Sequence, residues 1–235
     1  MKIKGIQKVT LIDYPGKIAS TIFLFGCNFR CGFCHNPELV LLEKENNENI
    51  SDTEILDYLK KRKEYLEGVC ITGGEPLISL EKNFLREIKN LGYDIKLDTN
   101  GSFPERLKEL IDEKLIDFVA MDIKTSKENY EKIINSVIDI NKMEQSIKII
   151  SSMKDYEFRT TIAEELHSIE DLEKIALWLN DIIGKKPKKF VLQGFKNMGK
   201  LIDERMKSFF DCSEEFLINA REKIKDYFEE VEIRI

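Results

Sequence analysis

Three cysteines lie within eight residues of one another, at the end of the first strand-like run of the chain. They are Cys27, Cys31 and Cys34, and the run before them, 19–25, is rich in β-branched and aromatic residues. Thiolates are the ligands that iron–sulfur clusters take, and three of them in one loop favour a soft metal. A four-iron cluster held by three protein thiolates keeps one iron open for a non-protein ligand.

Other interpretations of the cysteines remain open at this point. A zinc site could be completed by His35, although a second ligand pair of the usual spacing is missing. Three incidental thiols are the other alternative. Cys70 and Cys212 are expected to be buried structural residues, because free cysteine packs as a small hydrophobic side chain. A lone histidine is usually a hydrogen-bonded structural group, which is the role we expect for His167.

Polar motifs follow three further strand-like runs. They are Gly73-Gly74-Glu75-Pro76 after 68–72, Asp98-Thr99-Asn100-Gly101 at the end of 93–98, and Asp122-Ile123-Lys124 at the end of 118–123. Glycine lacks a Cβ atom and lets the backbone approach a ligand, whereas Glu75 could instead anchor its own loop. Because barrel enzymes build their sites at the carboxyl ends of strands, the last two motifs are expected to point at one pocket.

Strand-like runs alternate with amphipathic helical patterns along the whole chain. The expected strands are 19–25, 68–72, 93–98, 118–123, 147–150, 158–162, 190–193 and 231–235; the expected helices are 52–66, 80–91, 104–112, 127–141, 169–183 and 214–228, with a charged, Asn-rich loop at 43–49. About six βα units fit, fewer than the eight of a complete barrel. We expect an α/β fold, a partial (β/α)6-type TIM barrel, in a single domain over 1–235.

Composition narrows the possible partners and compartments. The chain has 37 basic and 43 acidic residues and a formal net charge of -6, so neither nucleic acid nor an anionic membrane is an expected partner. No apolar run approaches the roughly 20 residues that span a bilayer, and the start lacks the apolar stretch of a signal peptide. Five cysteines, three of them crowded together, do not form a typical disulfide framework. We expect a cytoplasmic protein.

The cysteine spacing, with Phe33 before the third cysteine, resembles the signature loop of radical S-adenosylmethionine (SAM) enzymes. In that family the open iron is chelated by the amino and carboxylate groups of SAM. The segments Leu11-Ile12-Asp13-Tyr14-Pro15-Gly16 and Cys34-His35-Asn36-Pro37-Glu38 are similar to the activating enzymes of glycyl-radical proteins, especially those of anaerobic ribonucleotide reductase and pyruvate formate-lyase. The likeness is densest over roughly the first forty residues and recurs as short motifs to about Arg159.

The resemblance implies a [4Fe-4S] cluster on the three cysteines and a set of SAM-binding residues. That set is Phe33, Cys34, His35, Gly73, Gly74, Glu75, Asp98, Thr99, Asn100, Asp122, Ile123, Lys124 and Arg159. It also implies a monovalent cation beside the SAM carboxylate, held by Asp98, Thr99 and Asp122. Where the pyruvate formate-lyase activase has a histidine near its last SAM-contacting strand, this chain reads Gln193-Gly194-Phe195-Lys196, so the C-terminal cofactor contacts stay unassigned.

The implied reaction is reductive cleavage of SAM by the cluster, which gives a 5′-deoxyadenosyl radical that abstracts hydrogen from a glycine of a partner enzyme. The protein's task is then positioning and exclusion of water, so no catalytic side chains beyond the cluster ligands are expected. A separate electron donor, flavodoxin or ferredoxin, is expected, because no cysteine-rich insert follows Cys34. The alternatives are a radical SAM enzyme acting on a small molecule, or a non-enzymatic electron-transfer protein that recruits Cys70 or Cys212 as a fourth ligand.

Overall fold

The computed structural model describes residues 1–41 and 49–235, so the expected Asn-rich loop falls outside the described residues except for its last position. The chain divides into two compact units. The first comprises Met1–Asn28, Glu38–Thr99 and Glu105–Val119, and the second comprises Phe29–Pro37, Asn100–Pro104 and Ala120–Ile235. The prediction of a single domain over 1–235 stays a prediction.

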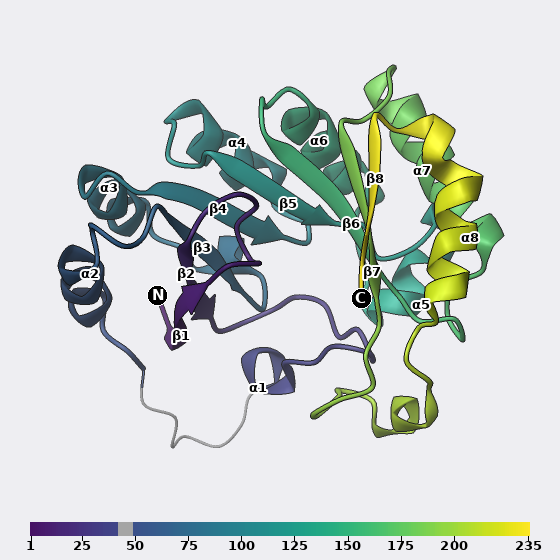
Figure 1. The fold of residues 1–235 in the computed structure, drawn as a ribbon, viewed down its shortest axis with the longest axis horizontal. Coiled ribbons are helices and arrows are strands. Elements are labelled where there is room, and N and C mark those ends of the chain that lie inside the picture. The colour runs from purple at the N-terminus through teal and green to yellow at the C-terminus, as the bar shows by residue number, and fades with distance from the viewer. Residues whose placement is uncertain (42–48) are drawn as a thin grey trace. The chain divides into compact units, whose positions relative to one another are not determined.

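The first unit is built on four strands, each of which pairs with its neighbour in the chain (Figure 1). They are β1 (Ile3–Thr10), β2 (Ala19–Leu24), β3 (Gly68–Gly73) and β4 (Asp94–Thr99). β1 runs antiparallel to β2, whereas β2, β3 and β4 are parallel. The three parallel strands were expected, and β1 is an addition to the expected set. Parallel pairing brings the carboxyl ends of these strands to one edge.

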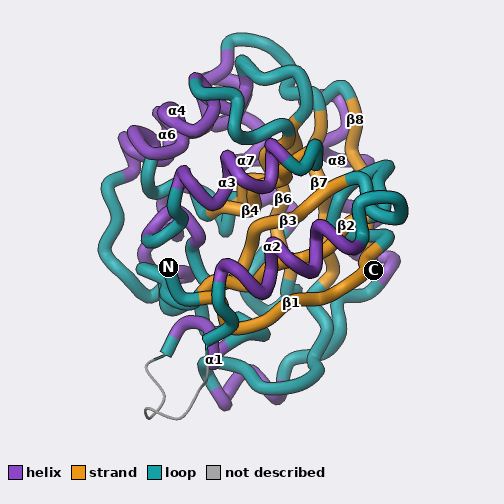
Figure 2. Tube along the Cα trace, turned by 90° about the vertical axis from the view of Figure 1, so that its left-hand side faces the viewer, coloured by secondary structure: helices purple, strands orange, loops and turns teal. Residues whose placement is uncertain are grey.

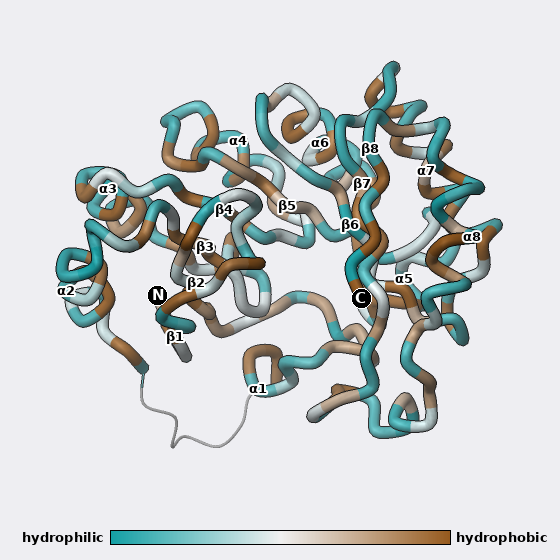
Figure 3. The backbone as a smooth tube through the Cα atoms, in the orientation of Figure 1, coloured by the Kyte–Doolittle hydropathy of each residue, from teal (hydrophilic) through white to brown (hydrophobic). Residues whose placement is uncertain are grey.

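The helices of the first unit follow the expected pattern, with shorter ends. α1 (Pro37–Val40) and α4 (Pro104–Asp112) each take their first residue from the second unit; the others are α2 (Asp52–Lys61), a 3-10 turn at Pro76–Ile78 and α3 (Lys82–Asn90). A reciprocal capping box between Ser51 and Glu54 starts α2. α2 and α3 lie next to each other (Figure 2), and hydrophobic and hydrophilic residues alternate along them (Figure 3).

The second unit contains the remaining strands and four helices. β5 (Phe118–Asp122) begins in the first unit and ends in the second, and β6 (Tyr156–Ile162), β7 (Lys189–Gly194) and β8 (Glu230–Arg234) form a parallel set. The helices are α5 (Tyr130–Ile134), α6 (Ile140–Ser151), α7 (Ile169–Ile183) and α8 (Glu214–Ile224), with 3-10 turns at Lys127–Asn129, Glu204–Ser208 and Lys225–Tyr227. α7 and α8 lie beside β7 and β8 (Figure 1).

Two expected elements between 127 and 150 are wrong. The single helix over 127–141 is broken, because Asn135 adopts a left-handed backbone with φ 48° after α5, and Asp139 caps the separate helix α6. The strand expected at 147–150 is the last part of α6. Met143, Ile147 and Ile150 are buried at helical spacing there, so the apolar run is one face of a helix.

Buried apolar residues fill both sides of the parallel strands. Ile22, Ile71 and Leu97 are fully buried in the first unit, as are Phe158 and Phe190 in the second. Strands of this kind read as continuous hydrophobic runs because both faces are covered. No helix in residues 1–41 or 49–235 is both long and apolar enough to cross a membrane.

Candidate active site

In the first unit, the start of the cysteine loop packs directly on the glycine motif that follows β3. A Cβ atom on Gly74 would lie 2.1 Å from the carbonyl oxygen of Gly26 and 3.0 Å from the Cβ of Cys27. The backbone N–H of Glu75 also donates to Gly26 O at 2.7 Å. Gly74 is therefore needed because the backbone carrying the first cysteine passes where a side chain would start.

Glu75 anchors the loop between β3 and the 3-10 turn. Its side chain is fully buried, and Oε1 accepts hydrogen bonds from Leu77 N at 3.0 Å and from Thr99 Oγ1 at 2.9 Å. The second bond ties the motif after β3 to the motif at the end of β4. These contacts support the anchoring alternative for Glu75, while direct contact of Glu75 or Thr99 with SAM stays a prediction.

A buried lysine that the sequence motifs did not single out accompanies Asp98. Lys96 is 1% exposed, and its ammonium forms an ion pair with the Asp98 carboxylate on the same strand. The Nζ atom also lies 3.9 Å from the Sγ of Cys70 and 6.0 Å from the centroid of the Phe118 ring. Residues two apart on a strand share a face, so the Lys-x-Asp spacing could have predicted that these two side chains form a pair.

In the second unit, three predicted residues form one charge cluster. Asp122 Oδ1 accepts from Arg159 Nε at 2.5 Å, and Asp122 Oδ2 accepts from Lys124 Nζ at 3.0 Å. Burial opposes the charge on Asp122, but the guanidinium and the ammonium outweigh it and hold its pKa well below the usual range. Burial likewise opposes the charge on Lys124, and Asp122 raises the pKa of Lys124 above its ordinary value.

Backbone and aromatic contacts fix this charge cluster in place. Ile123 N donates to Arg159 O at 2.8 Å, and His167 Nε2 donates to Lys124 O at 2.9 Å. His167 is 1% exposed, and its ring packs edge-on against Phe33 with centroids 6.4 Å apart. His167 is thus a buried residue hydrogen-bonded to backbone, in agreement with the structural role expected for it. Phe33 lies beside it in the cysteine loop.

Cys31 and Cys34 lie on a turn of the second unit in which Cys34 N donates to Cys31 O at 3.1 Å. Burial raises the pKa of the Cys31 thiol to about 11, against the opposing charge of Lys124. A thiol in such surroundings becomes a thiolate when a metal binds it. None of the five cysteines forms a disulfide, and Cys70 and Cys212 are buried as expected for structural residues. By donor type, the thiols of this loop suit iron–sulfur ligation.

The segment 195–213, which we call the β7–α8 segment, covers this part of the cysteine loop. His35 Nε2 donates to Lys196 O at 2.6 Å, and the His35 ring stacks on Phe195 at 5.2 Å between centroids. Asp203 N donates to Gly32 O at 3.0 Å. A Cβ atom on Gly32 would lie 2.5 Å from the Cε of Met206, so the methionine occupies the space above this glycine. His35 thus connects the loop to the C-terminal quarter of the chain.

The motif after β4 is rigid as well. Asn100 Oδ1 accepts from Ser102 N at 3.0 Å and from Ser102 Oγ at 2.5 Å. Gly101 O accepts from Ser146 Oγ of α6 at 2.6 Å, and Asn100 is 5% exposed. Each unit therefore presents its share of the predicted site residues on ordered backbone.

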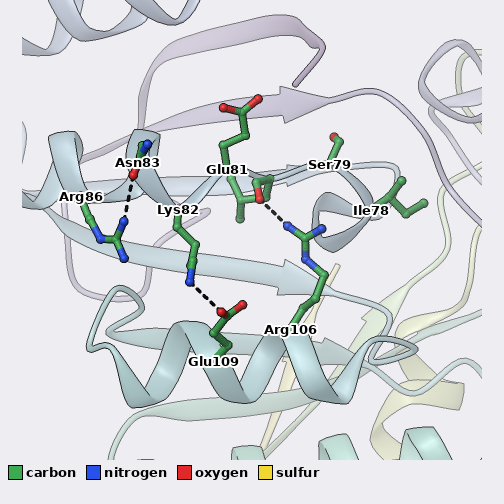
Figure 4. Close-up of a pocket in the computed structure, with 9 residues that line it drawn as sticks. Ile78, Ser79, Glu81, Lys82, Asn83, Arg86, Arg106 and Glu109 are labelled. Atoms are coloured by element: carbon green, nitrogen blue, oxygen red, sulfur yellow. Dashed lines mark hydrogen bonds and ion pairs between the residues drawn. The ribbon is translucent and has the colours of Figure 1, made fainter.

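A separate pocket of about 490 Å³ lies in the first unit and contains none of the predicted site residues (Figure 4). Its charged side chains are paired locally: Lys82 with Glu109 at 2.6 Å, and Arg106 with the carbonyl of Leu80 at 2.6 Å. Arg86 likewise donates to Asn83 at 2.8 Å. The chemistry expected of the motifs does not reside there.

Comparison with known proteins places the chain in a family. The model of the Radical SAM superfamily matches residues 21–179. A Methanocaldococcus jannaschii protein, provisionally named a glycyl-radical enzyme activating enzyme, is 36% identical over 191 residues, covering 76% of this chain and 75% of that protein. The pyruvate formate-lyase-activating enzyme of Staphylococcus aureus is 27% identical over 204 residues, which cover 74% of this chain and 79% of that protein. That of Clostridium pasteurianum is 32% identical over 129 residues, 52% of each chain.

Solved structures agree on the fold. Streptococcus suis SuiB bound to S-adenosylmethionine gives a TM-score of 0.63 at 15% identity, and the match covers 90% of this chain and 48% of that one. A domain of a Bacteroides vulgatus pyruvate-formate lyase-activating enzyme gives a TM-score of 0.57 at 16% identity, and the match covers 71% of this chain and 98% of that one. The expected radical SAM fold, and the cofactors that this family uses, a [4Fe-4S] cluster and SAM, are confirmed. The chain belongs to the radical SAM superfamily, and its relatives there include glycyl-radical enzyme activating enzymes.

Proposed function

We propose that this enzyme activates a glycyl-radical enzyme by removing a hydrogen atom from a backbone glycine of its partner. The observation that carries the proposal is the 36% identity to a protein provisionally named a glycyl-radical enzyme activating enzyme, over three quarters of both chains. The partner would be of the anaerobic ribonucleotide reductase or pyruvate formate-lyase type. A glycine Cα suits such a reaction because no side chain obstructs the approach.

Cys27, Cys31 and Cys34 are the proposed cluster ligands, and none of the three is in a disulfide. The bound cluster and SAM together supply the carbon-centred radical, which is the cofactors' chemistry. Burial keeps solvent from Cys31 and raises the pKa of its thiol. The bound iron would therefore be what stabilises the thiolate form of this ligand. The remaining iron position would be left to SAM.

Lys124 and Arg159 are the proposed contacts for the negative end of SAM. Asp122 fixes both cations, which reduces the entropy that either side chain would lose on binding a carboxylate. Phe33 is 4% exposed and held edge-on by His167, so it offers a rigid apolar surface for the adenine ring. Glu75 and Thr99 keep the loops after β3 and β4 tied together during turnover.

An electron must come from outside the chain. We propose flavodoxin or ferredoxin as the donor, because the sequence between Cys34 and Cys70 holds no further cysteine for a second cluster. The purified enzyme is incubated with either reduced protein, and electron paramagnetic resonance then measures the signal of the reduced cluster. Failure of both to reduce the cluster would contradict this part of the proposal.

The central test is anaerobic reconstitution followed by capture of the partner. Enzyme with a reduced cluster is mixed with SAM and with proteins pulled down from anaerobic extract of the source organism. The expected result is 5′-deoxyadenosine release together with a glycyl-radical resonance on one protein that contains the target glycine. Cleavage of SAM with no radical on any protein, but with turnover of a metabolite, would instead favour the small-molecule alternative.

A matched pair of variants links the site to the reaction. Lys124→Met removes a partly buried ammonium from the charge cluster, whereas Lys127→Met removes an exposed lysine that pairs with Glu144 at 2.8 Å. Loss of a hydrogen bond to a charged group weakens binding about tenfold or more. We expect SAM affinity to fall by about that factor in the first variant and to stay unchanged in the second, measured by equilibrium binding.

A further inference from the structure

The monovalent cation implied by the family resemblance does not fit the charges of this chain. Asp98 already pairs with the ammonium of Lys96 inside the first unit. Asp122 already pairs with Arg159 and Lys124 inside the second unit. A carboxylate that is neutralised by a fixed cation has little remaining attraction for a second one, because the two positive charges repel at contact distance. Both carboxylates named for the cation are in this state.

Lys96 differs from an ordinary surface lysine. Its side chain is 2% exposed, and a buried ammonium is costly unless it is paired. The Asp98 carboxylate, the Cys70 sulfur at 3.9 Å and the face of Phe118 at 6.0 Å surround the charge. Asp98 lies on the same strand as Lys96, Cys70 lies on β3 and Phe118 on β5, all within the first unit. The ammonium is therefore held at Asp98 by packing from several sides and not by the ion pair alone.

We propose that the ammonium of Lys96 takes the place of the monovalent cation at Asp98, so that this enzyme binds SAM without sodium or potassium. Lys96 is then a positioning residue: it neutralises Asp98 and fixes the orientation of its carboxylate. A tethered ammonium has the charge of a potassium ion and can donate hydrogen bonds, but it cannot be washed out. The inference rests on the proposed place of Asp98 in the SAM site and is independent of the partner enzyme.

The test compares SAM binding in two buffers, one with potassium chloride and one with tetramethylammonium chloride, whose cation is too large to coordinate. The probe for the cation is Tl⁺, a potassium substitute whose NMR signal reports binding to the anaerobic holoenzyme directly. For wild type we expect equal SAM affinity in both buffers and no bound Tl⁺. A wild type that binds one Tl⁺ per chain, or that needs potassium to bind SAM, would overturn the proposal.

Lys96→Met gives the reciprocal result if the proposal holds. Asp98 then lacks its ammonium, so SAM affinity should fall about tenfold in tetramethylammonium and recover when potassium is added, with Tl⁺ now bound. Lys96→Arg keeps the charge and should remain indifferent to potassium. Lys89→Met is the matched control, because Lys89 pairs with Asp117 at 2.7 Å in the same unit. A Lys96→Met enzyme that binds SAM normally in both buffers overturns the proposal.

Two further readouts separate this inference from the proposed function. Asp98→Asn should weaken SAM binding in both buffers equally, since it removes the charge that either cation would balance; unchanged affinity overturns the inference. Failure of the activase assignment has another signature, namely normal SAM cleavage with no glycyl radical on any protein. If Lys96→Met does not fold, the wild-type measurements with Tl⁺ and the two buffers decide the matter alone.

Discussion

Gly74→Ala is expected to disable SAM cleavage through a steric effect on the first cysteine. The new Cβ atom would lie 2.1 Å from Gly26 O, whereas non-bonded atoms of this kind stay about 3.3 Å apart, so the backbone beside Cys27 must shift by about 1 Å. A misplacement of about 1 Å at a reacting centre costs about 100-fold in rate. We therefore expect a fall of about 100-fold in 5′-deoxyadenosine release by the reconstituted enzyme, measured anaerobically by chromatography.

The matched control is Gly184→Ala. Gly184 has φ 71° at the end of α7 and no atom within 4 Å of the added carbon, so it suffers left-handed backbone strain of about 1 kcal/mol without a collision. Circular dichroism confirms that both variants are folded before they are assayed. A folded Gly74→Ala enzyme with full iron content and a rate within about threefold of wild type would refute the steric reasoning.

Three other predictions concern metal content, pH and stability. Alanine at Cys27, Cys31 or Cys34 should abolish the iron–sulfur absorption, whereas alanine at the buried Cys70 or Cys212 should leave iron content intact; loss of iron in Cys70→Ala would count against three-cysteine ligation. Burial lowers the pKa of His167 below its ordinary 6.5, so the unfolded state binds more protons and stability should decline as pH falls below about 6.5; urea melts of wild type should show more of this decline than those of His167→Gln. Arg234→Met leaves the fully buried Glu157 without its cation, at a cost of about 3 kcal/mol in unfolding free energy, and Glu157→Gln in the same background should recover part of it; equal stability of wild type and Arg234→Met would disprove the effect.

The parallel framework could be predicted from the sequence because its signals are local. The run before the cysteines, the helix at Pro104–Asp112 and the strands ending in the polar motifs all carry clear periodicity and turn residues. The errors fall between 127 and 150, where the outcome depends on tertiary packing. Asn135 could have continued a helix, and the apolar run 147–150 fits a strand as well as a helix until its buried neighbours are known.

The motifs of the site could be predicted from the sequence, but the residues that pack against them and hold them in place could not. Cysteine spacing and strand-end carboxylates name residues directly, since their chemistry is a property of residue type. The roles of Lys96 and Met206 depend on what surrounds them: a buried strand position for the first and the space above Gly32 for the second. Glu75 was ambiguous for the same reason until its bond to Thr99 was known.

The β7–α8 segment also sets an order of assembly during synthesis. A chain that has emerged only as far as β6 already contains all three cysteines, but not the carbonyl that receives His35 or the methionine above Gly32. Because these contacts need residues made after β6, the ligand loop acquires its final shape only once the β7–α8 segment has been synthesised. Iron delivered earlier would meet thiols on a peptide that lacks these contacts, so we expect cluster insertion to follow synthesis of the β7–α8 segment.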